Sequence, residues 1–399
     1  MRWIEGGVTA AQGFRAAGVS AGIKRSRKPD VALIAAARPV TAAGVFTVNT
    51  VKAAPVLISM ERLRRGKSMA VLMNSGCANC MTGEPGYRDA LALGRSVAHE
   101  LGIAEQDVLL ASTGLIGRRL PVARIARVIP ALAMGLSRAQ HGAAAQAILT
   151  TDRLPKEAAV AAKVAGRTVR VGGMAKGAGM IQPWMATMLC TITTDAAIAP
   201  SLLKRLLQHA AMRTFNRITV DGDMSTNDCV FMLASGDSGA AVRPGTPAAR
   251  QFGAMLDAVC DRLAYLIVKD GEGAAKLMHV QVVGAKSERE AVACARQIAN
   301  SPLVKTMLAG SDPNVGRIAA AAGASSARFD PEKLEIHIGN QLVVRGGVAL
   351  HVGTSALRSM LTHPEISVRV NLRAGKSDSR MITCDLTEAY VRINAGYAT

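Results

Sequence analysis

The middle of the chain holds a glycine-rich stretch, residues 172–189, which reads GGMAKGAGMIQPWMATML. Glycines surround Lys176, and such a run indicates a backbone that is held at unusual dihedral angles or is approached closely by another group. Lys176 is not followed by Ser or Thr, so the run does not fit a P-loop. Pro183 then interrupts the chain, and from Thr187 the residues are typical of a buried strand.

Thr187 is therefore a threonine that opens a strand directly after a glycine-rich loop. If the peptide bond between Ala186 and Thr187 is cut, a new α-amino group with an ordinary pKa of about 8 can act as base for the threonine hydroxyl. The residues alone leave two interpretations open. One is an N-terminal threonine nucleophile, and the other is an ordinary buried strand threonine.

Strand-like and helix-like stretches alternate on both sides of this region, which predicts a mixed α and β fold. After Pro331 the pattern changes to short alternating strands that are separated by turn residues. Antiparallel sheets covered by helices fit this order better than a doubly wound parallel sheet. The predicted helices are 87–101, 201–214, 251–268 and 287–300, and the predicted strands are 68–73, 107–111, 333–338, 341–345, 367–372, 381–385 and 390–394.

The composition is that of a globular chain with a sizeable core. The 399 residues are 49% hydrophobic and 19% charged, with a mean hydropathy of +0.21, which excludes a disordered chain or a coiled coil. No apolar run approaches the ~20 residues of a membrane span. Residues 1–7 lack the apolar core of a secretory signal, so we expect a cytoplasmic location.

The chain is strongly basic, with 48 Lys and Arg against 29 Asp and Glu and a net charge of +19. Aromatic residues, on which nucleic-acid bases stack, make up 3%. The densest basic run, residues 24–28 (KRSRK), contains none and is interpreted as a solvated loop. We therefore expect neither nucleic acid nor membrane as a partner, and small acidic substrates fit the charge.

The cysteines and histidines give no clear catalytic or metal motif. Cys77 and Cys80 form a CxxC with no second pair and no neighbouring His, so a zinc site lacks ligands. A redox pair is the alternative interpretation, but it lacks a βαβ context. The GxSxG at residues 18–22 is followed by the basic run and not by a helix, so it is interpreted as a chance match.

Residues 176–189 closely resemble K-G-x-G-M-I-x-P-x-M-A-T-M-L, a signature of the ornithine acetyltransferase family, whose members are also called glutamate N-acetyltransferases. Further matches to the family follow in order along nearly the whole chain, which makes chance agreement negligible. They are residues 6–10, 13–18, 112–117, 216–228, 268–274 and 392–395.

The resemblance implies a precursor that cuts itself between Ala186 and Thr187, giving an alpha chain of residues 1–186 and a beta chain of residues 187–399. The implied fold is α/β (α+β), with layered β-sheets between helices and an N-terminal-threonine nucleophile. By the same resemblance, we expect the two chains to be interlocked and paired as a heterotetramer. We also expect Thr187 to take acetyl from N2-acetylornithine and pass it to glutamate, in the cyclic arginine pathway. No metal or tightly held cofactor is implied, and acetyl-CoA as a second donor is left open.

The same resemblance assigns the site residues. Thr113 and Gly114 match the oxyanion-hole pair, which stabilises charge on the acetyl oxygen. The sequence departs from the family at Cys77 and Cys80, where Asn and Ala are usual, and at Trp184 and Val315. The implied substrate contacts are Thr150, Lys176, Thr187, Glu272, Asn394 and Thr399.

Two other functions stay open at this stage. A self-cleaving N-terminal-threonine amidohydrolase would pass the acyl group to water instead of glutamate, and only the exclusion of water from the pocket separates it from a transferase. A binding protein with a dead site would not cut itself, and it would run as one band of full mass on a denaturing gel.

Overall fold

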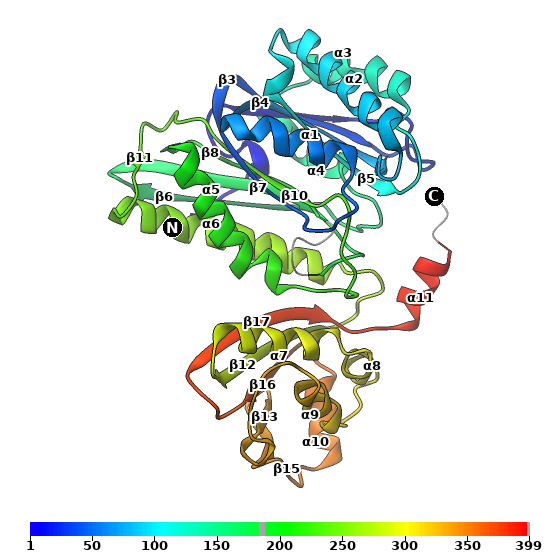
Figure 1. Ribbon diagram of the computed structural model, residues 1–399, viewed down its shortest axis with the longest axis vertical. Helices are drawn as coiled ribbons and strands as arrows, with labels where there is room; N and C mark the ends of the chain where they lie inside the picture. Colours follow the sequence, from blue (N-terminus) through cyan, green and yellow to red (C-terminus); the bar gives the residue numbers. More distant parts are fainter. Residues whose placement is uncertain (183–187, 397–399) are drawn as a thin grey trace. The chain divides into compact units, whose positions relative to one another are not determined.

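The computed structural model describes residues 1–182 and 188–396 (Figure 1). The predicted cleavage residues Ala186 and Thr187, together with Trp184 and Thr399, lie outside the described residues. The chain forms two compact units. The first is built from Met1–Asn216 and Asp223–Ile267, and the second from Arg217–Gly222 and the chain from Val268 onward.

The first unit is organised around one large mixed sheet. Its strand order, over the described residues, is β1-β6-β7-β8-β10-β3-β4-β5, and β2 pairs with β3. β4 runs parallel to β5, and β8 runs parallel to β10, while the other neighbours in this order are antiparallel. The strands are β1 (Arg2–Trp3), β2 (Phe14–Val19), β3 (Val31–Phe46), β4 (Lys67–Cys77), β5 (Val108–Leu115), β6 (Lys156–Val164), β7 (Arg167–Lys176), β8 (Leu189–Thr194) and β10 (Cys229–Ala234), and a small pair adds β9 (Ala197–Ile198) and β11 (Ala241–Val242).

The central strand β3 is apolar on both faces. Leu33 and Ile34 are neighbours in sequence and fully buried, yet they belong to different core clusters, because successive side chains of a strand point to opposite faces. The register between β3 and β4 shifts between Ala35 and Val40, around Pro39, which has no N–H to donate to a ladder. A strand buried on both faces explains the continuous apolar run at the start of β3.

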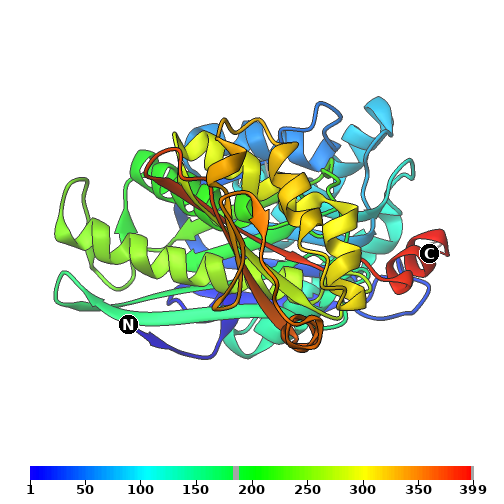
Figure 2. The same cartoon turned by 90° about the horizontal axis from the view of Figure 1, so that it is seen from below.

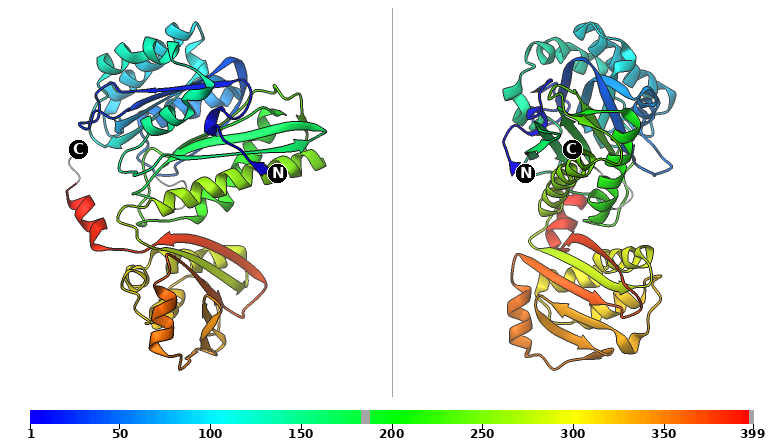
Figure 3. Two further views of the ribbon diagram at one scale, coloured as in Figure 1. Left: turned by 180° about the vertical axis from the view of Figure 1, so that it is seen from behind. Right: turned by 90° about the vertical axis from the view of Figure 1, so that its left-hand side faces the viewer.

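Helices cover both sides of this sheet (Figure 1). α1, α2 and α3 lie over the β3–β4–β5 end, α5 packs on β3, and α6 runs along the part built from β6, β7, β8 and β10, as Figure 3 also shows. The long neighbouring strands β6 and β7 are clear in the left view of Figure 3. The helices are α1 (Ala54–Arg62), α2 (Gly83–Leu101), α3 (Val122–Met134), α4 (His141–Ala147), α5 (Pro200–Arg213) and α6 (Pro247–Lys269).

The second unit is a smaller sheet with helices against it (Figure 2). Its strand order over the described residues is β15-β14-β13-β16-β12-β17. α7 packs on β12 and β17, with α8 and α9 packed on α7. The strands are β12 (Leu277–Ala285), β13 (Glu335–Ile338), β14 (Gln341–Arg345), β15 (Val348–Ala349), β16 (Glu365–Asn371) and β17 (Ser377–Cys384), and the helices are α7 (Glu288–Asn300), α8 (Pro302–Gly310), α9 (Gly316–Gly323), α10 (Thr354–Leu361) and α11 (Glu388–Ala395).

The expected architecture of layered sheets and helices is confirmed. The prediction of a strand over 390–394 is wrong, because these residues lie in α11. The alternation of Val391 and Ile393 is typical of a strand with one buried face. Both side chains are exposed, however, so the alternation does not mark a buried face. Across the described residues, no helix has the length and apolar character that crossing a bilayer requires.

Candidate active site

The site begins where the parallel strands β4 and β5 end side by side. Ser75 lies opposite Thr113 and Gly76 lies opposite Gly114 in the strand register. The Ser112 hydroxyl donates to Asn74 Oδ1 at 2.6 Å, and the Ser75 hydroxyl donates to the Ala147 carbonyl at 2.6 Å. These buried hydrogen bonds fix the two strand ends against each other and against α4.

Gly114 is a position where the fold needs glycine. Its φ is +127°, and a Cβ there would lie 2.4 Å from the carbonyl carbon of Gly76 and 2.6 Å from the backbone nitrogen of Cys77. These neighbours are backbone atoms and cannot rotate away. The two strands therefore approach closely at the turn that the family motif assigns to the oxyanion hole.

Lys176, at the end of β7, reaches this turn from the other side. Its buried ammonium group donates to Thr113 Oγ1 at 3.3 Å and lies 3.9 Å from Asp152 Oδ2. A charged donor in a buried setting attracts negative charge more strongly than the same group in water. The arrangement suits a reaction in which an oxyanion develops beside Thr113 and Gly114.

Asp152 is the buried centre of the charges around Lys176. Its Oδ1 accepts from Lys156 Nζ at 2.6 Å and from the Gly177 N–H at 2.7 Å, and its Oδ2 accepts from the Thr150 N–H at 3.0 Å. Burial by itself would raise the pKa of this carboxyl, but the ammonium groups of Lys176 and Lys156 outweigh burial and hold the pKa well below its ordinary value. Asp152 is therefore charged and holds Lys176 and Thr150 in one cluster.

The chain enters β8 beside this cluster. Leu189, the first residue of β8, lies opposite Lys176 in the antiparallel β7–β8 register. The N–H of Met188 donates to Asp228 Oδ1 at 2.9 Å, and the N–H of Cys229 donates to the Met188 carbonyl at 3.1 Å. Met188 follows Thr187 directly in the sequence.

Asp228 is fully buried, and its Oδ2 has no hydrogen-bond partner among the described residues. Burial raises the pKa of this carboxyl well above its ordinary range and so favours its neutral form. The preceding residue, Asn227, donates from Nδ2 to the carbonyls of Ala78 and Ser112 at 2.7 and 2.8 Å. The segment before β10 thus ties together the chain ends of β4, β5 and β8.

Two predicted site residues lie in the second unit and contact each other. Asn394 Nδ2, on α11, donates to Glu272 Oε2 at 2.8 Å. Glu272 lies in the turn after α6 and is half-buried, whereas Asn394 is exposed. The pair presents one carboxylate and one amide at the surface of this unit.

Sequence reasoning named four residues that the structure brings into one cluster, Thr113, Gly114, Thr150 and Lys176. It gave no role to Asp152, Lys156, Asn227 or Asp228. Asp152 lies two residues after the predicted Thr150 and Asp228 ends the family match at residues 216–228, but only burial distinguishes these two acids from surface acids. Lys156 carried no sequence signal, because the burial of its ammonium group against Asp152 is not visible in the neighbouring residues.

The cysteines of the CxxC are buried. Burial raises the pKa of the Cys77 thiol, which is the opposite of the lowered pKa of a reactive thiol. Its Sγ contacts the Arg118 carbonyl at 3.3 Å. Within the described residues no His, Cys, Asp and Glu side chains cluster in a way that could hold a metal ion.

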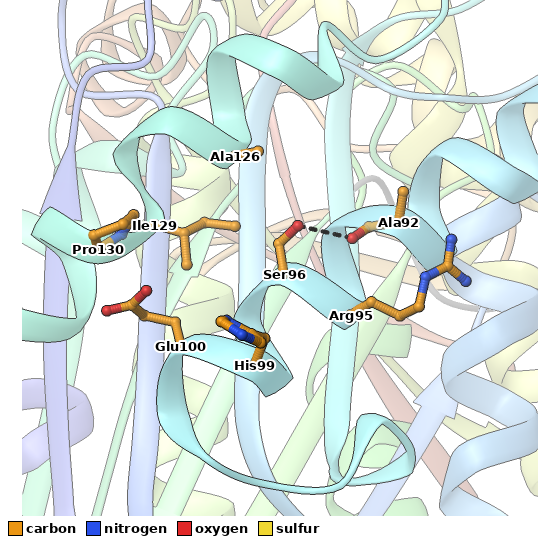
Figure 4. A pocket seen from close by; sticks show the side chains of 8 residues that line it. All are labelled: Ala92, Arg95, Ser96, His99, Glu100, Ala126, Ile129 and Pro130. Carbon is orange, nitrogen blue, oxygen red and sulfur yellow. Dashed lines mark hydrogen bonds between the residues drawn. The ribbon is translucent and has the colours of Figure 1, made fainter.

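A surface pocket of about 420 Å³ lies between α2 and α3 (Figure 4). His99 and Glu100 line it with Arg95 and Ser96, and the Ser96 hydroxyl donates to the Ala92 carbonyl one helical turn earlier. None of the site residues described above lines this pocket. Its polar side chains come from α2, and the α3 residues that line it are Ala126, Ile129 and Pro130, so the pocket is distinct from the strand-end site.

The chain matches the model of the ArgJ family over residues 15–399. It is 46% identical to an arginine biosynthesis bifunctional protein ArgJ of Thermosynechococcus vestitus, with 99% of each chain covered, and 46% identical to one of Symbiobacterium thermophilum, with 100% of each covered. A crystal structure of arginine biosynthesis bifunctional protein argJ from Bacillus halodurans is 40% identical. It matches 52% of this chain and 97% of that chain with a TM-score of 0.50.

Proposed function

Because this chain belongs to the ArgJ family, we propose that Thr187 carries an acetyl group from N2-acetylornithine to glutamate by a ping-pong mechanism. The family makes the chain an acetyltransferase of arginine biosynthesis. The observation that supports the proposed site is the register of β7 and β8. Leu189, two residues after Thr187, lies opposite Lys176, and the Lys176 ammonium lies 3.3 Å from Thr113 Oγ1.

The chemistry follows from these groups. The Thr187 hydroxyl attacks the acetyl carbonyl, its proton passes to the freed α-amine, and the carbonyl oxygen becomes an oxyanion beside Thr113 and Gly114. The C–N bond then breaks, and ornithine leaves with the proton on its amine. The amine of glutamate attacks the acetyl-Thr187 ester in turn, which gives N-acetylglutamate and restores the hydroxyl.

The proposed cut between Ala186 and Thr187 gains support from the solved relative. That chain is almost fully covered by the match although it spans about half of this one. The curated relatives, in contrast, align along their entire length. A protein encoded as one chain and cut near its middle would give both results. Glu272, Asn394 and Thr399 remain proposed substrate contacts. The heterotetramer and the absence of a tightly held cofactor also remain proposals.

Mass spectrometry tests the mechanism directly. After incubation with N2-acetylornithine alone, we expect one acetyl group on the first residue of the beta chain, and its transfer to glutamate on addition of that acceptor. Release of acetate at the same rate without glutamate would favour the amidohydrolase. A single uncut band without acetylation would favour a binding protein.

Acetyl-CoA as a second donor is the finer proposal that the word bifunctional in the relatives' names supports. The test is formation of N-acetylglutamate from acetyl-CoA and glutamate with no acetylornithine present. We expect this activity to depend on Thr187, because both donors would acetylate the same hydroxyl. Product formation by an uncut Thr187→Ala protein would place the second reaction elsewhere.

A further inference from the structure

The basic run at residues 24–28 does not behave as one solvated loop. Residues 25–28 are exposed as expected, but Lys24 is half-buried. A Cβ on Gly76 would lie 3.3 Å from Lys24 Cγ, so the lysine stem passes over the glycine that pairs with Gly114. Lys24 therefore lies beside the strand ends of the candidate active site.

Buried hydrogen bonds fix this position. The carboxylate of Asp30 accepts from the N–H groups of Ala21 and Ile23 at 2.6 Å each and from that of Lys24 at 3.1 Å. The Asp30 carbonyl accepts from the Ser75 N–H at 2.9 Å. The start of the loop is thereby attached to β4 at the residue opposite Thr113.

The Lys24 ammonium is available for a ligand. It donates to the Pro29 carbonyl at 2.7 Å, and a lysine ammonium has three hydrogens to donate. Among the described residues it has no other hydrogen-bond or ion-pair partner. Lys176, by comparison, is engaged with Thr113 and Asp152.

We propose that Lys24 is a substrate-binding residue that holds the α-carboxylate shared by N2-acetylornithine and glutamate, an inference that rests on the proposed function. In both substrates this carboxylate is bonded to the carbon that carries the reacting nitrogen. When the acetyl carbonyl lies at Thr113 and Gly114, the carboxylate must therefore lie within one side chain's reach of that pair. Lys24 is a cation that meets this condition, because its side chain lies beside Gly76, the residue opposite Gly114.

The charge environment is consistent with this role. Burial lowers the pKa of Lys24 to about 8, Asp30 and Asp152 oppose the shift, and Lys176 and Lys28 add to it. Lys24 is thus charged at neutral pH and loses its charge as the pH rises past 8. Its contribution to carboxylate binding should be lost over the same range.

The test compares Lys24→Met with Lys28→Met, which removes an exposed charge from the same loop, and with Lys24→Arg, which keeps the charge. We expect Lys24→Met to raise the KM for both substrates and the Kd for glutamate about 10- to 100-fold, which is the loss expected when a hydrogen bond to a charged group is removed. The kcat should stay within about threefold of the wild-type value. Lys24→Arg should recover part of the loss. In the wild type KM should rise above pH 8, and in Lys24→Met it should not.

Denaturing gels and thermal unfolding show whether each variant is cut and folded. KM and Kd values for Lys24→Met within twofold of those for Lys28→Met would overturn the assignment. Calorimetric binding of glutamate separates this inference from the proposed function. Wild-type binding without transfer would refute the function, whereas transfer that is indifferent to Lys24 would refute only the role of Lys24. A wild type that neither binds glutamate nor transfers acetyl would refute both.

Discussion

Asp152 is a single carboxylate that faces the buried ammonium groups of Lys156 and Lys176. Asp152→Asn would remove the carboxylate from its ion pairs with the buried ammonium groups of Lys156 and Lys176, and removing one partner of a buried ion pair costs about 3–5 kcal/mol. We expect this loss in the free energy of unfolding, measured by urea titration at pH 7. The matched control is Asp237→Asn at the exposed pair with Arg38, where about 0–1 kcal/mol is expected.

The same residue predicts a pH dependence. The folded pKa of Asp152 is depressed, so its stabilisation is present above the ordinary carboxyl pKa of ~3.9 and is lost as the pH falls below it. The stability difference between wild type and Asp152→Asn should therefore shrink between pH 5 and pH 2. A difference that stays constant over this range would contradict the charge argument.

Gly114 provides a prediction about backbone geometry. In Gly114→Ala the new Cβ meets the backbone of Gly76 and Cys77, so the turn must shift, and we expect the N–H to lose its proposed alignment with the acetyl oxygen. Loss of one oxyanion donor lowers kcat about 10²–10³-fold. Gly117→Ala is the control, since Gly117 also has a positive φ of +81° but has nothing within 4 Å of an added Cβ. Equal kcat values for the two variants would contradict an oxyanion role for Gly114.

At this scale the sequence motifs predicted which residues bear chemistry but not which residues hold them in place. Thr113 and Lys176 stand in recognisable motifs, and the structure brings them within 3.3 Å. Lys24 stood in a run whose composition indicates solvent exposure, and its position depends on buried Asp30. Burial and long-range contacts of this kind leave no local pattern, so sequence alone could not predict them.

At the scale of elements, Asn227 and Asp228 directly precede β10 and hydrogen-bond to the chain near the ends of β4, β5 and β8. Asn227→Ala removes the donor to the buried carbonyls of Ala78 and Ser112, and each orphaned group costs about 1–3 kcal/mol. Because Ser112 precedes the oxyanion pair, we expect kcat to fall together with the unfolding temperature. Thermal unfolding and steady-state kinetics measure the two effects.

Asn49→Ala is the control for Asn227→Ala. Asn49 donates to the Met224 carbonyl at 3.1 Å, just before the same segment, but it is only half-buried, so water can replace it. We expect a loss below 1 kcal/mol and nearly normal kcat. If Asn227→Ala behaved in the same way, the segment would not support the oxyanion turn.

Elements with strong local signals were predictable. β14 was predicted over its full extent, and α7 begins where Ser287, three residues before Glu290, caps it with a 3.3 Å hydrogen bond. α11 was not predictable from alternation, because Val391 and Ile393 fit either structure. The parallel pairs β4–β5, β8–β10 and β12–β16 were also missed, since short turns between strands favoured antiparallel neighbours.

At the scale of the whole molecule, the strand order predicts whether the two chains stay together after cleavage. A cut between Ala186 and Thr187 falls between β7 and β8, which are neighbours in the sheet. β8 and β10 would then belong to the beta chain, yet they lie between β7 and β3 of the alpha chain. The ladders on both sides hold the beta strands in place, so the two chains should stay together until the protein is denatured.

The Thr187 hydroxyl is proposed to act both in self-cleavage and in acetyl transfer, so its substitution tests both steps. Thr187→Ala should remain one chain and transfer no acetyl, because both steps need a hydroxyl at this position. Thr187→Ser keeps the hydroxyl, so it should still cut itself and retain some transfer. Wild type should give two bands on a denaturing gel and one species in native chromatography, since the sheet holds both chains. Wild-type transfer rates in an uncut Thr187→Ala protein would place the nucleophile elsewhere and refute the mechanism.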